Sequence, residues 1–166
     1  MDNLVIRKAR IDEIQEILEI FEAAKSYMYQ CGNLTQWGKE YPGYDLIKED
    51  IDRDCFYVGL NNGKISFVFY FYIGEDPTYD IIDYGSWVND LPYGTIHRIA
   101  SNGTTKNVFK IVVDYCLTLI NNIRIDTHEN NHTMLNNLKK YGFKQCGIIY
   151  VRDHMERIAF QYYQEN

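Results

Sequence analysis

Two histidines and one polar loop are the residues of this sequence best suited to chemistry. His97 and His128 carry imidazoles whose ordinary pKa of about 6.5 suits a general base working near neutral pH. Between them, residues 101–107 combine small side chains, hydroxyls and one lysine. If this loop leads into the N-terminus of a helix, its N–H groups would attract phosphate. The same residue types are ordinary helix caps, so the loop alone leaves phosphate binding and capping both open.

A metal site is not predicted, although His128 and His132 are four residues apart. Histidines at that spacing can bind zinc when both lie on one face of a helix. Here the next helix is expected to begin at Asn131, after His128, and no HExxH motif or neighbouring cysteine completes a ligand set. A serine hydrolase is not supported either, because the sequence has no G-x-S-x-G segment.

Hydrophobic periodicity predicts the strands and helices that must position these residues. An Asn62-Gly63 pair between two apolar runs predicts a β-hairpin, because it supplies the positive φ angles of tight hairpin turns. Residues 74–91 are expected to form a loop whose aromatic residues Tyr79, Tyr84 and Trp87 are not simply solvated. The predicted strands are residues 4–6, 56–60, 64–73, 95–101, 123–126, 146–151 and 158–163. The predicted helices are residues 11–21, 45–53, 106–120 and 131–141, the last ended by Gly142. In the first helix the residues expected to face inward are Ile11, Ile14, Ile17, Leu18 and Phe21. In the third, Val112 and Leu119 are expected to face inward.

Composition limits the class of protein. The chain of 166 residues is 46% hydrophobic and 15% aromatic, which fits one folded domain over residues 1–166, of mixed α/β or α+β class. Its net charge of −6 argues against nucleic-acid binding. The four cysteines are scattered, so reduced, buried thiols are expected. Since neither a signal segment nor a membrane-spanning stretch is present, we expect a cytoplasmic protein with no membrane partner.

Several segments of the chain resemble the core of the GNAT N-acetyltransferase superfamily. They are residues 96–101 with the loop that follows, residues 126–131, and Tyr141-Gly142-Phe143. The most specific match is Asn131, then Met134, then Gly142-Phe143, in the spacing of the family's N-x-x-A…G-F segment. The resemblance implies a mixed, mostly antiparallel sheet of about seven strands, splayed between the fourth and fifth strands and flanked by about four helices.

The resemblance also implies acetyl-coenzyme A as cosubstrate. Its pantetheine arm would pair with backbone groups of Ile99, Ala100 and Ser101. Its pyrophosphate would rest on the amides from Thr104 to Phe109. The residues that the resemblance assigns to the coenzyme are Ile99, Ala100, Ser101, Thr104, Thr105, Lys106, Asn107, Val108, Phe109 and Asn131.

Two positions depart from the family pattern. Asn107 and Phe109 stand where the family's phosphate loop has glycine or a small residue, and a phenylalanine side chain there could obstruct the ligand. Leu138 stands where the family frequently has the tyrosine that protonates the departing thiolate. Tyr141 lies three residues further along and could serve instead, although packing beside the helix cap explains it equally well.

The reaction implied is direct transfer of an acetyl group to an amine on a small molecule or peptide. His97 and His128 are the candidate bases, with an interior hydrogen-bonded role and a capping role as their respective alternatives. Trp37, Tyr41 and Tyr84 are candidates for the acceptor pocket, and core packing around the loops is the alternative. A different class of function stays open, namely a coenzyme A-binding or regulatory protein without activity. The aromatic surplus would permit a homodimer.

Overall fold

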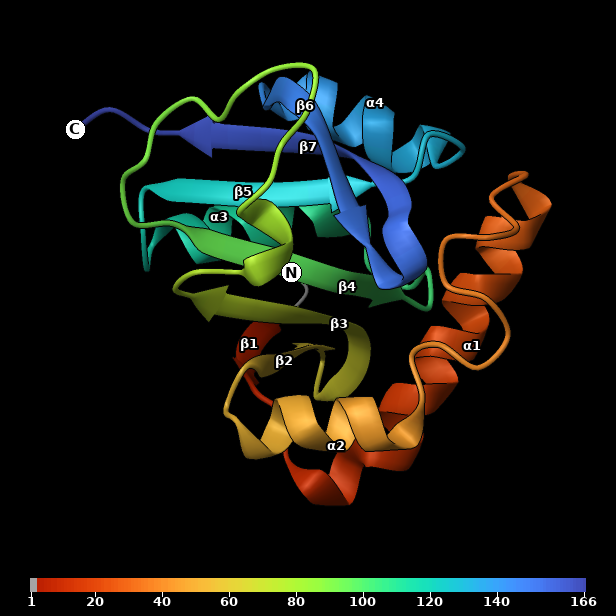
Figure 1. Cartoon of the computed structure of the whole chain (residues 1–166). Coiled ribbons are helices and arrows are strands. Elements are labelled where there is room, and N and C mark those ends of the chain that lie inside the picture. Colours follow the sequence, from red (N-terminus) through yellow and green to blue (C-terminus); the bar gives the residue numbers. More distant parts are fainter. Residues whose placement is uncertain (1–2) are drawn as a thin grey trace. The chain divides into compact units, whose positions relative to one another are not determined.

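The computed structural model of the chain describes residues 3–166, apart from the side chain of Asp153. It contains a seven-stranded sheet with the order β1-β2-β3-β4-β5-β7-β6, in which β4 and β5 are parallel and the other described pairs are antiparallel (Figure 1). The strands are β1 (Leu4–Lys8), β2 (Phe56–Asn61), β3 (Lys64–Ile73), β4 (Gly94–Ser101), β5 (Asn122–Thr127), β6 (Lys144–Val151) and β7 (Met155–Tyr163). The α-helices are α1 (Ile14–Gln30), α2 (Tyr44–Asp52), α3 (Val108–Leu117) and α4 (His132–Tyr141). The predicted mixed, mostly antiparallel sheet with four helices is confirmed.

The chain forms two compact units, which we describe separately. The first, called the N-terminal unit, comprises the residues up to Phe71 together with His97–Phe109. The second, called the C-terminal unit, comprises Tyr72–Ile96 together with Lys110–Asn166. In the part of the chain that the structure describes, no helix has both the length and the apolar character needed to cross a bilayer.

The core of the N-terminal unit lies between α1, α2 and strands β2 and β3. Ile17, Phe21 and Ile47 project from the two helices and are at most 1% exposed. The predicted stripe of α1 is confirmed at Ile17 and Phe21 but wrong at Ile11, which lies in a 3-10 turn before the helix and is 46% exposed. The helix begins only at Ile14. The residue before it, Glu13, has a buried carboxylate that accepts hydrogen bonds from Arg7.

The hairpin between β2 and β3 forms as predicted. Asn62 and Gly63 adopt φ angles of 50° and 80°, the left-handed pair that a two-residue hairpin turn requires. The turn pairs Asn61 with Lys64 and Leu60 with Ile65, and a register shift between Gly59 and Leu60 then places Gly59 opposite Phe67. The ring of Phe67 is fully buried and covers Gly59, where it occupies the space that a side chain would need.

In the C-terminal unit, α4 follows the prediction closely and α3 does not. Asn131 caps α4, and Gly142 ends it with a left-handed φ of 105°. The predicted helix over 106–120 is shorter, because Asn107 adopts a left-handed φ of 58° and a right-handed helix can begin only after it. Val112 is buried as expected, whereas Leu119 lies beyond the helix and is 47% exposed.

The segment before β4 is part of the C-terminal unit, and some of its aromatic side chains are buried there. Tyr79 is 1% exposed, and its hydroxyl donates to the carboxylate of Asp126 at 2.7 Å. Trp87 donates its indole N–H to the carbonyl of Tyr79 and stacks on the guanidinium of Arg124. The expectation for Tyr79 and Trp87 is confirmed, and that for Tyr84 is wrong, because Tyr84 is 89% exposed.

The thiols of Cys31, Cys55, Cys116 and Cys146 are unpaired. Three of them are buried, as predicted, but Cys31 is exposed. Burial raises the pKa of the Cys55 and Cys146 thiols, which keeps both protonated near neutral pH.

We predict that Gly59→Ala destabilises the protein by about 1–3 kcal/mol, because the new methyl group would overlap the ring of Phe67. Urea unfolding measures the change. The double variant Gly59→Ala with Phe67→Leu should recover part of the loss, since leucine vacates the ring's space. If the single variant is as stable as the parent chain, the tight contact is not present in solution.

Candidate active site

The candidate donor site begins in β4, where the strand is irregular. Arg98 has a φ of 53°, in the left-handed region that residues other than glycine seldom adopt. A left-handed residue in a strand is the kind of distortion found in β-bulges, which are over-represented next to active sites and re-aim the groups beside them. The backbone groups that follow, from Ile99 to Ser101, are those that the family resemblance assigns to pantetheine.

The loop after β4 is fixed in place by hydroxyl and amide side chains. The backbone N–H of Asn102 donates to the carbonyl of Ser66 in β3, at 3.0 Å. The Ser66 hydroxyl also contacts the hydroxyls of Thr104 and Thr105, at 2.9 and 2.6 Å. Asn61 of β2 donates to Thr105 as well. These threonine hydroxyls therefore hold the loop on β2 and β3, instead of facing a ligand as the sequence suggested.

Several backbone donors of the loop are available to a ligand. The N–H of Thr104 is used by the side chain of Asn102. The N–H groups of the next four residues, 105–108, donate to no protein acceptor among residues 3–166. They lie at the start of α3, where the helix dipole adds positive potential, and the exposed Lys106 is among them. Such a group of donors is suited to an anion such as phosphate.

The two departures from the expected phosphate loop have different outcomes. Asn107 adopts a left-handed conformation with a φ of 58°, as a glycine there could. Asparagine is among the residues that tolerate this region best, so the substitution keeps the backbone path open. Phe109 is 7% exposed, so its side chain is buried.

His97 lies in the N-terminal unit, on the same strand as the donor residues. Its half-buried ring packs at a tilt against that of Tyr70, with 5.6 Å between the ring centres. Its position in β4 is two residues before Ile99. This placement is compatible with either of the roles expected for His97, the base and the interior residue.

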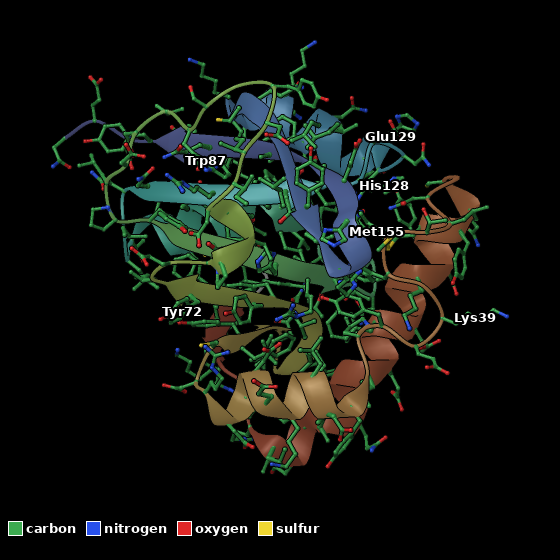
Figure 2. All side chains as sticks on the ribbon, in the orientation of Figure 1. Lys39, Tyr72, Trp87, His128, Glu129 and Met155 are labelled. Atoms are coloured by element: carbon green, nitrogen blue, oxygen red, sulfur yellow. The ribbon has the colours of Figure 1, made fainter. Side chains whose placement is uncertain are left out.

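His128 lies in the C-terminal unit, at the end of β5 (Figure 2). Its Nδ1 accepts the backbone N–H of Asn130 at 3.0 Å, which stabilises the turn before α4. Burial and the nearby Arg157 lower the pKa of His128, so the ring is neutral at pH 7. A neutral imidazole has one acceptor nitrogen, and here that nitrogen is already engaged. The geometry therefore favours the capping role for His128.

Asn131 and Tyr141 also have structural partners. The side chain of Asn131 caps α4 by accepting the N–H of Met134 at 3.1 Å. The Tyr141 hydroxyl donates to Asp114 at 2.6 Å and so links α4 to α3. Burial, with the carboxylate of Asp114, raises the pKa of Tyr141 well above its usual value. A tyrosine that holds its proton so firmly is a poor acid near neutral pH.

The aromatic candidates for an acceptor pocket differ in their surroundings. Trp37 packs edge-on against Phe21, with 5.5 Å between the ring centres, as part of the core around α1. Tyr41 accepts a hydrogen bond from Arg98 at 3.0 Å. Tyr84 belongs to the C-terminal unit and is almost fully exposed. Core packing is therefore the better description of Trp37.

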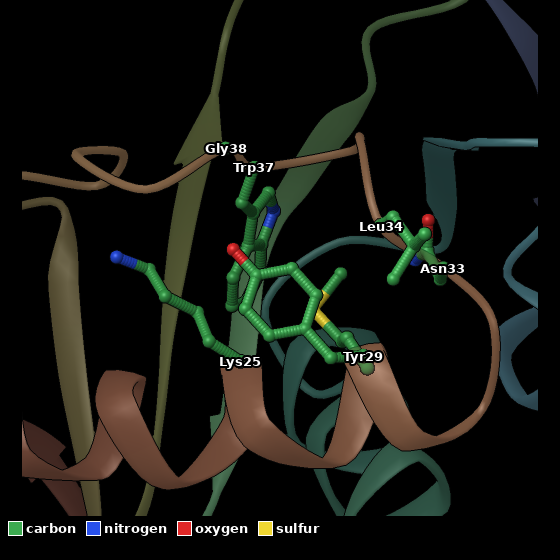
Figure 3. Close-up of a pocket in the computed structure, with 7 residues that line it drawn as sticks. Lys25, Tyr29, Asn33, Leu34, Trp37 and Gly38 are labelled. Carbon is green, nitrogen blue, oxygen red and sulfur yellow. The ribbon is translucent and has the colours of Figure 1, made fainter.

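A small pocket lies beside Trp37, between the end of α1 and the segment after it (Figure 3). Asn33 lines it with a buried side chain whose Oδ1 accepts no hydrogen bond. Lys25 lines it too and donates to the carbonyl of Lys39 at 2.9 Å. The space suits about one water molecule, which would satisfy Asn33. It is too small for an acetyl acceptor.

The N-terminal unit thus brings together His97, Tyr41 and the donor residues from Ile99 to Phe109. His128, Asn131, Tyr141 and Tyr84 belong to the other unit. Among the described residues, no cluster of histidine, cysteine and carboxylate side chains is arranged to bind a metal.

The sequence analysis missed the ion pair between Arg98 and Asp50, at 2.7 Å. One signal was present, since Asp50 lies three residues after Ile47 and therefore on the inward face of α2. An acidic residue in that position needs a buried partner.

Comparison with solved structures finds close similarity over the whole chain. A GNAT-family acetyltransferase from Streptococcus agalactiae 2603 is 30% identical, with a TM-score of 0.89, and the match covers 98% of this chain and 96% of that one. GNAT-family acetyltransferases from Listeria monocytogenes 4b F2365 and Bacillus cereus ATCC 10987 are 16% and 17% identical, with TM-scores of 0.70 and 0.64. These matches cover 97% and 98% of this chain, and 95% and 99% of the other two, and they show likeness of fold alone. No protein-family model and none of the curated proteins matches the sequence.

We predict that Asn107→Ala lowers the free energy of unfolding by about 1 kcal/mol, because alanine tolerates the left-handed conformation poorly. Asn107→Gly should leave stability nearly unchanged. Chemical unfolding of both variants, with Lys106→Ala as the exposed control, measures the difference. Equal stability of the alanine and glycine variants would show that position 107 is not left-handed in solution.

Proposed function

Because the chain belongs to the GNAT family of acetyltransferases, we propose that it transfers an acetyl group from acetyl-coenzyme A to an amine. The observation that carries this proposal is the group of backbone N–H donors between β4 and α3, at residues 105–108. A coenzyme with a diphosphate needs such donors, and a protein of net charge −6 must supply them locally.

In the proposed complex the donor is held mainly by backbone groups. The diphosphate accepts hydrogen bonds from the N–H groups of residues 105–108, and the ammonium of Lys106 adds a positive charge. The pantetheine arm runs along Ile99, Ala100 and Ser101 and pairs with their backbone. Ala100 is 3% exposed and packs in the core, so this proposal assigns no role to its side chain.

The proposed chemistry is a direct attack of the neutral amine on the thioester carbonyl. A bond from nitrogen to carbon forms, the bond from carbon to sulfur breaks, and coenzyme A leaves as a thiolate. A backbone N–H near Ile99 stabilises the oxyanion of the intermediate, an effect that can be worth about 3 kcal/mol. The thiolate takes its proton from water, because a thiol has a pKa of about 8.5.

We assign the base that removes the amine proton to His97. It lies on the strand that carries the donor residues, whereas the acceptor nitrogen of His128 is engaged by Asn130. Tyr141 is not assigned as the acid, because Asp114 holds its hydroxyl. The acceptor is an amine on a small molecule or a peptide.

A second candidate function is coenzyme A binding without transfer. Leu138, at the position where the family frequently has its acid, is fully buried, so no tyrosine-like group can act from there. This alternative shares the donor site with the first and differs only in the chemical step.

We predict that about 1 mM acetyl-coenzyme A raises the melting temperature by roughly 5–10 °C if it exceeds its dissociation constant about a hundredfold. Asn107→Glu should abolish most of the shift, because its carboxylate would lie beside the diphosphate. Asn107→Ala separates this effect from backbone strain, and Asn136→Glu on the exposed face of α4 is the charge control.

Release of free thiol with a panel of amines then separates the two functions. Transfer to any amine supports the enzyme. A shift without thiol release favours the binding protein, and the absence of any shift contradicts both.

We predict that His97→Gln lowers kcat by roughly 100- to 10,000-fold with little change in donor affinity, as expected for loss of a general base. His128→Gln should leave kcat within about threefold, because its ring serves the turn before α4. Steady-state kinetics with calorimetric donor titrations measure both. A larger loss of kcat in the His128 variant would transfer the role of base to that residue.

A further inference from the structure

A buried ionic cluster holds the irregular residue of β4. The guanidinium of Arg98 donates through Nε and Nη2 to one oxygen of Asp50, at 3.1 and 2.7 Å. Its Nη1 donates to the hydroxyl of Tyr41 at 3.0 Å. The same group lies over the ring of Tyr70, 4.6 Å from the ring centre. Nε, Nη1 and Nη2 of Arg98 thus all donate to side chains of the N-terminal unit.

Burying this cluster costs desolvation free energy. The side chains of Asp50 and Arg98 are 4% and 11% exposed, so both charges have lost most of their water. Burial raises the pKa of Asp50, and the charge of Arg98 opposes that rise. Buried ion pairs seldom stabilise a fold more than apolar side chains of the same volume would. Stability alone is therefore a poor reason for placing this pair inside the unit.

The position of the pair in the chain suggests another reason. Arg98 is the left-handed residue of β4, and it immediately precedes Ile99. A left-handed conformation at a residue other than glycine is strained and persists only when neighbouring contacts impose it. Asp50, from α2, and Tyr41, from the segment before α2, supply such contacts.

We propose that Asp50 and Tyr41 are positioning residues that hold Arg98 in its left-handed conformation and so aim the backbone groups of Ile99, its N–H among them, at the thioester. The inference rests on the proposed function, because it assumes that these groups meet the donor. Neither Asp50 nor Tyr41 touches the donor in this assignment. Both act through Arg98, from the side of α2.

The test compares Asp50→Asn, Arg98→Met and the double variant with the parent chain. Asp50→Asn should lower kcat roughly 10- to 100-fold, the effect of a small misplacement of catalytic groups. The double variant leaves no buried charge unpaired, so its melting temperature should recover toward that of the parent, while kcat stays low. Asp52→Asn is the matched control, because Asp52 forms an exposed ion pair with Lys48 on the same helix.

All kinetics are measured at least 15 °C below each melting temperature, so that every variant is folded. Tyr41→Phe removes one hydrogen bond without a charge and should lower kcat roughly two- to tenfold. If Asp50→Asn does not fold, the kcat of Tyr41→Phe tests the positioning role instead. If these variants lose stability but keep the parent's kcat, or if the double variant regains both, the positioning role is overturned.

The parent chain is the reference that separates the two proposals. If the parent neither binds acetyl-coenzyme A nor releases thiol, the proposed function fails and the positioning role falls with it. If the parent is active and the Asp50, Arg98 and Tyr41 variants match its kcat, only the positioning role fails.

Discussion

The N–H groups between β4 and α3 are the feature on which the candidate site depends. A loop offers such donors only if its own polar side chains do not take them. Here the hydroxyls of Thr104 and Thr105 face Ser66 and Asn61, so the side chains fix the loop while the N–H groups of residues 105–108 stay available. Asn107 completes the arrangement, because its left-handed backbone lets α3 start after the donors and not within them. Fixing the loop in advance reduces the entropy that a ligand must overcome on binding.

Much of the fold could be predicted from the sequence, because many of its signals are local. The hairpin at Asn62-Gly63 and the end of α4 at Gly142 each follow from the backbone freedom of the residues that occupy them. The predictions that were wrong concern residues whose exposure depends on the tertiary structure and not on the local sequence. Ile11 continues the apolar stripe of α1, but it lies in a turn before the helix. Tyr84 was expected to avoid solvent because it is aromatic, yet it is 89% exposed in the segment before β4.

The candidate site could be predicted only in part, for the same reason. The strand, loop and helix that carry the proposed donor backbone could be predicted, because their order is written in local patterns. The roles of side chains could not, because they depend on contacts between distant residues. The Tyr141 hydroxyl was a candidate acid until its partner, Asp114, 27 residues earlier, was known. Asp50 and Arg98 are 48 residues apart, and neither the period of α2 nor the pattern of β4 pairs them. The backbone conformation could not be predicted either, since nothing in the sequence around Arg98 indicates a left-handed residue.

The proposed donor site is made of backbone groups, and such a site is compatible with membership of the family despite differences at characteristic positions. What a diphosphate requires is N–H groups on an accessible backbone, and asparagine at 107 meets that requirement as glycine would. Phenylalanine at 109 has a buried side chain. The chemical step has no such tolerance, because a base or an acid must be a particular side chain at a particular place. Family membership therefore bears more directly on the donor than on the acid, for which Leu138 leaves no side chain in the usual position. The choice between transfer and binding alone thus depends on whether solvent can protonate the thiolate, as the ordinary pKa of a thiol allows.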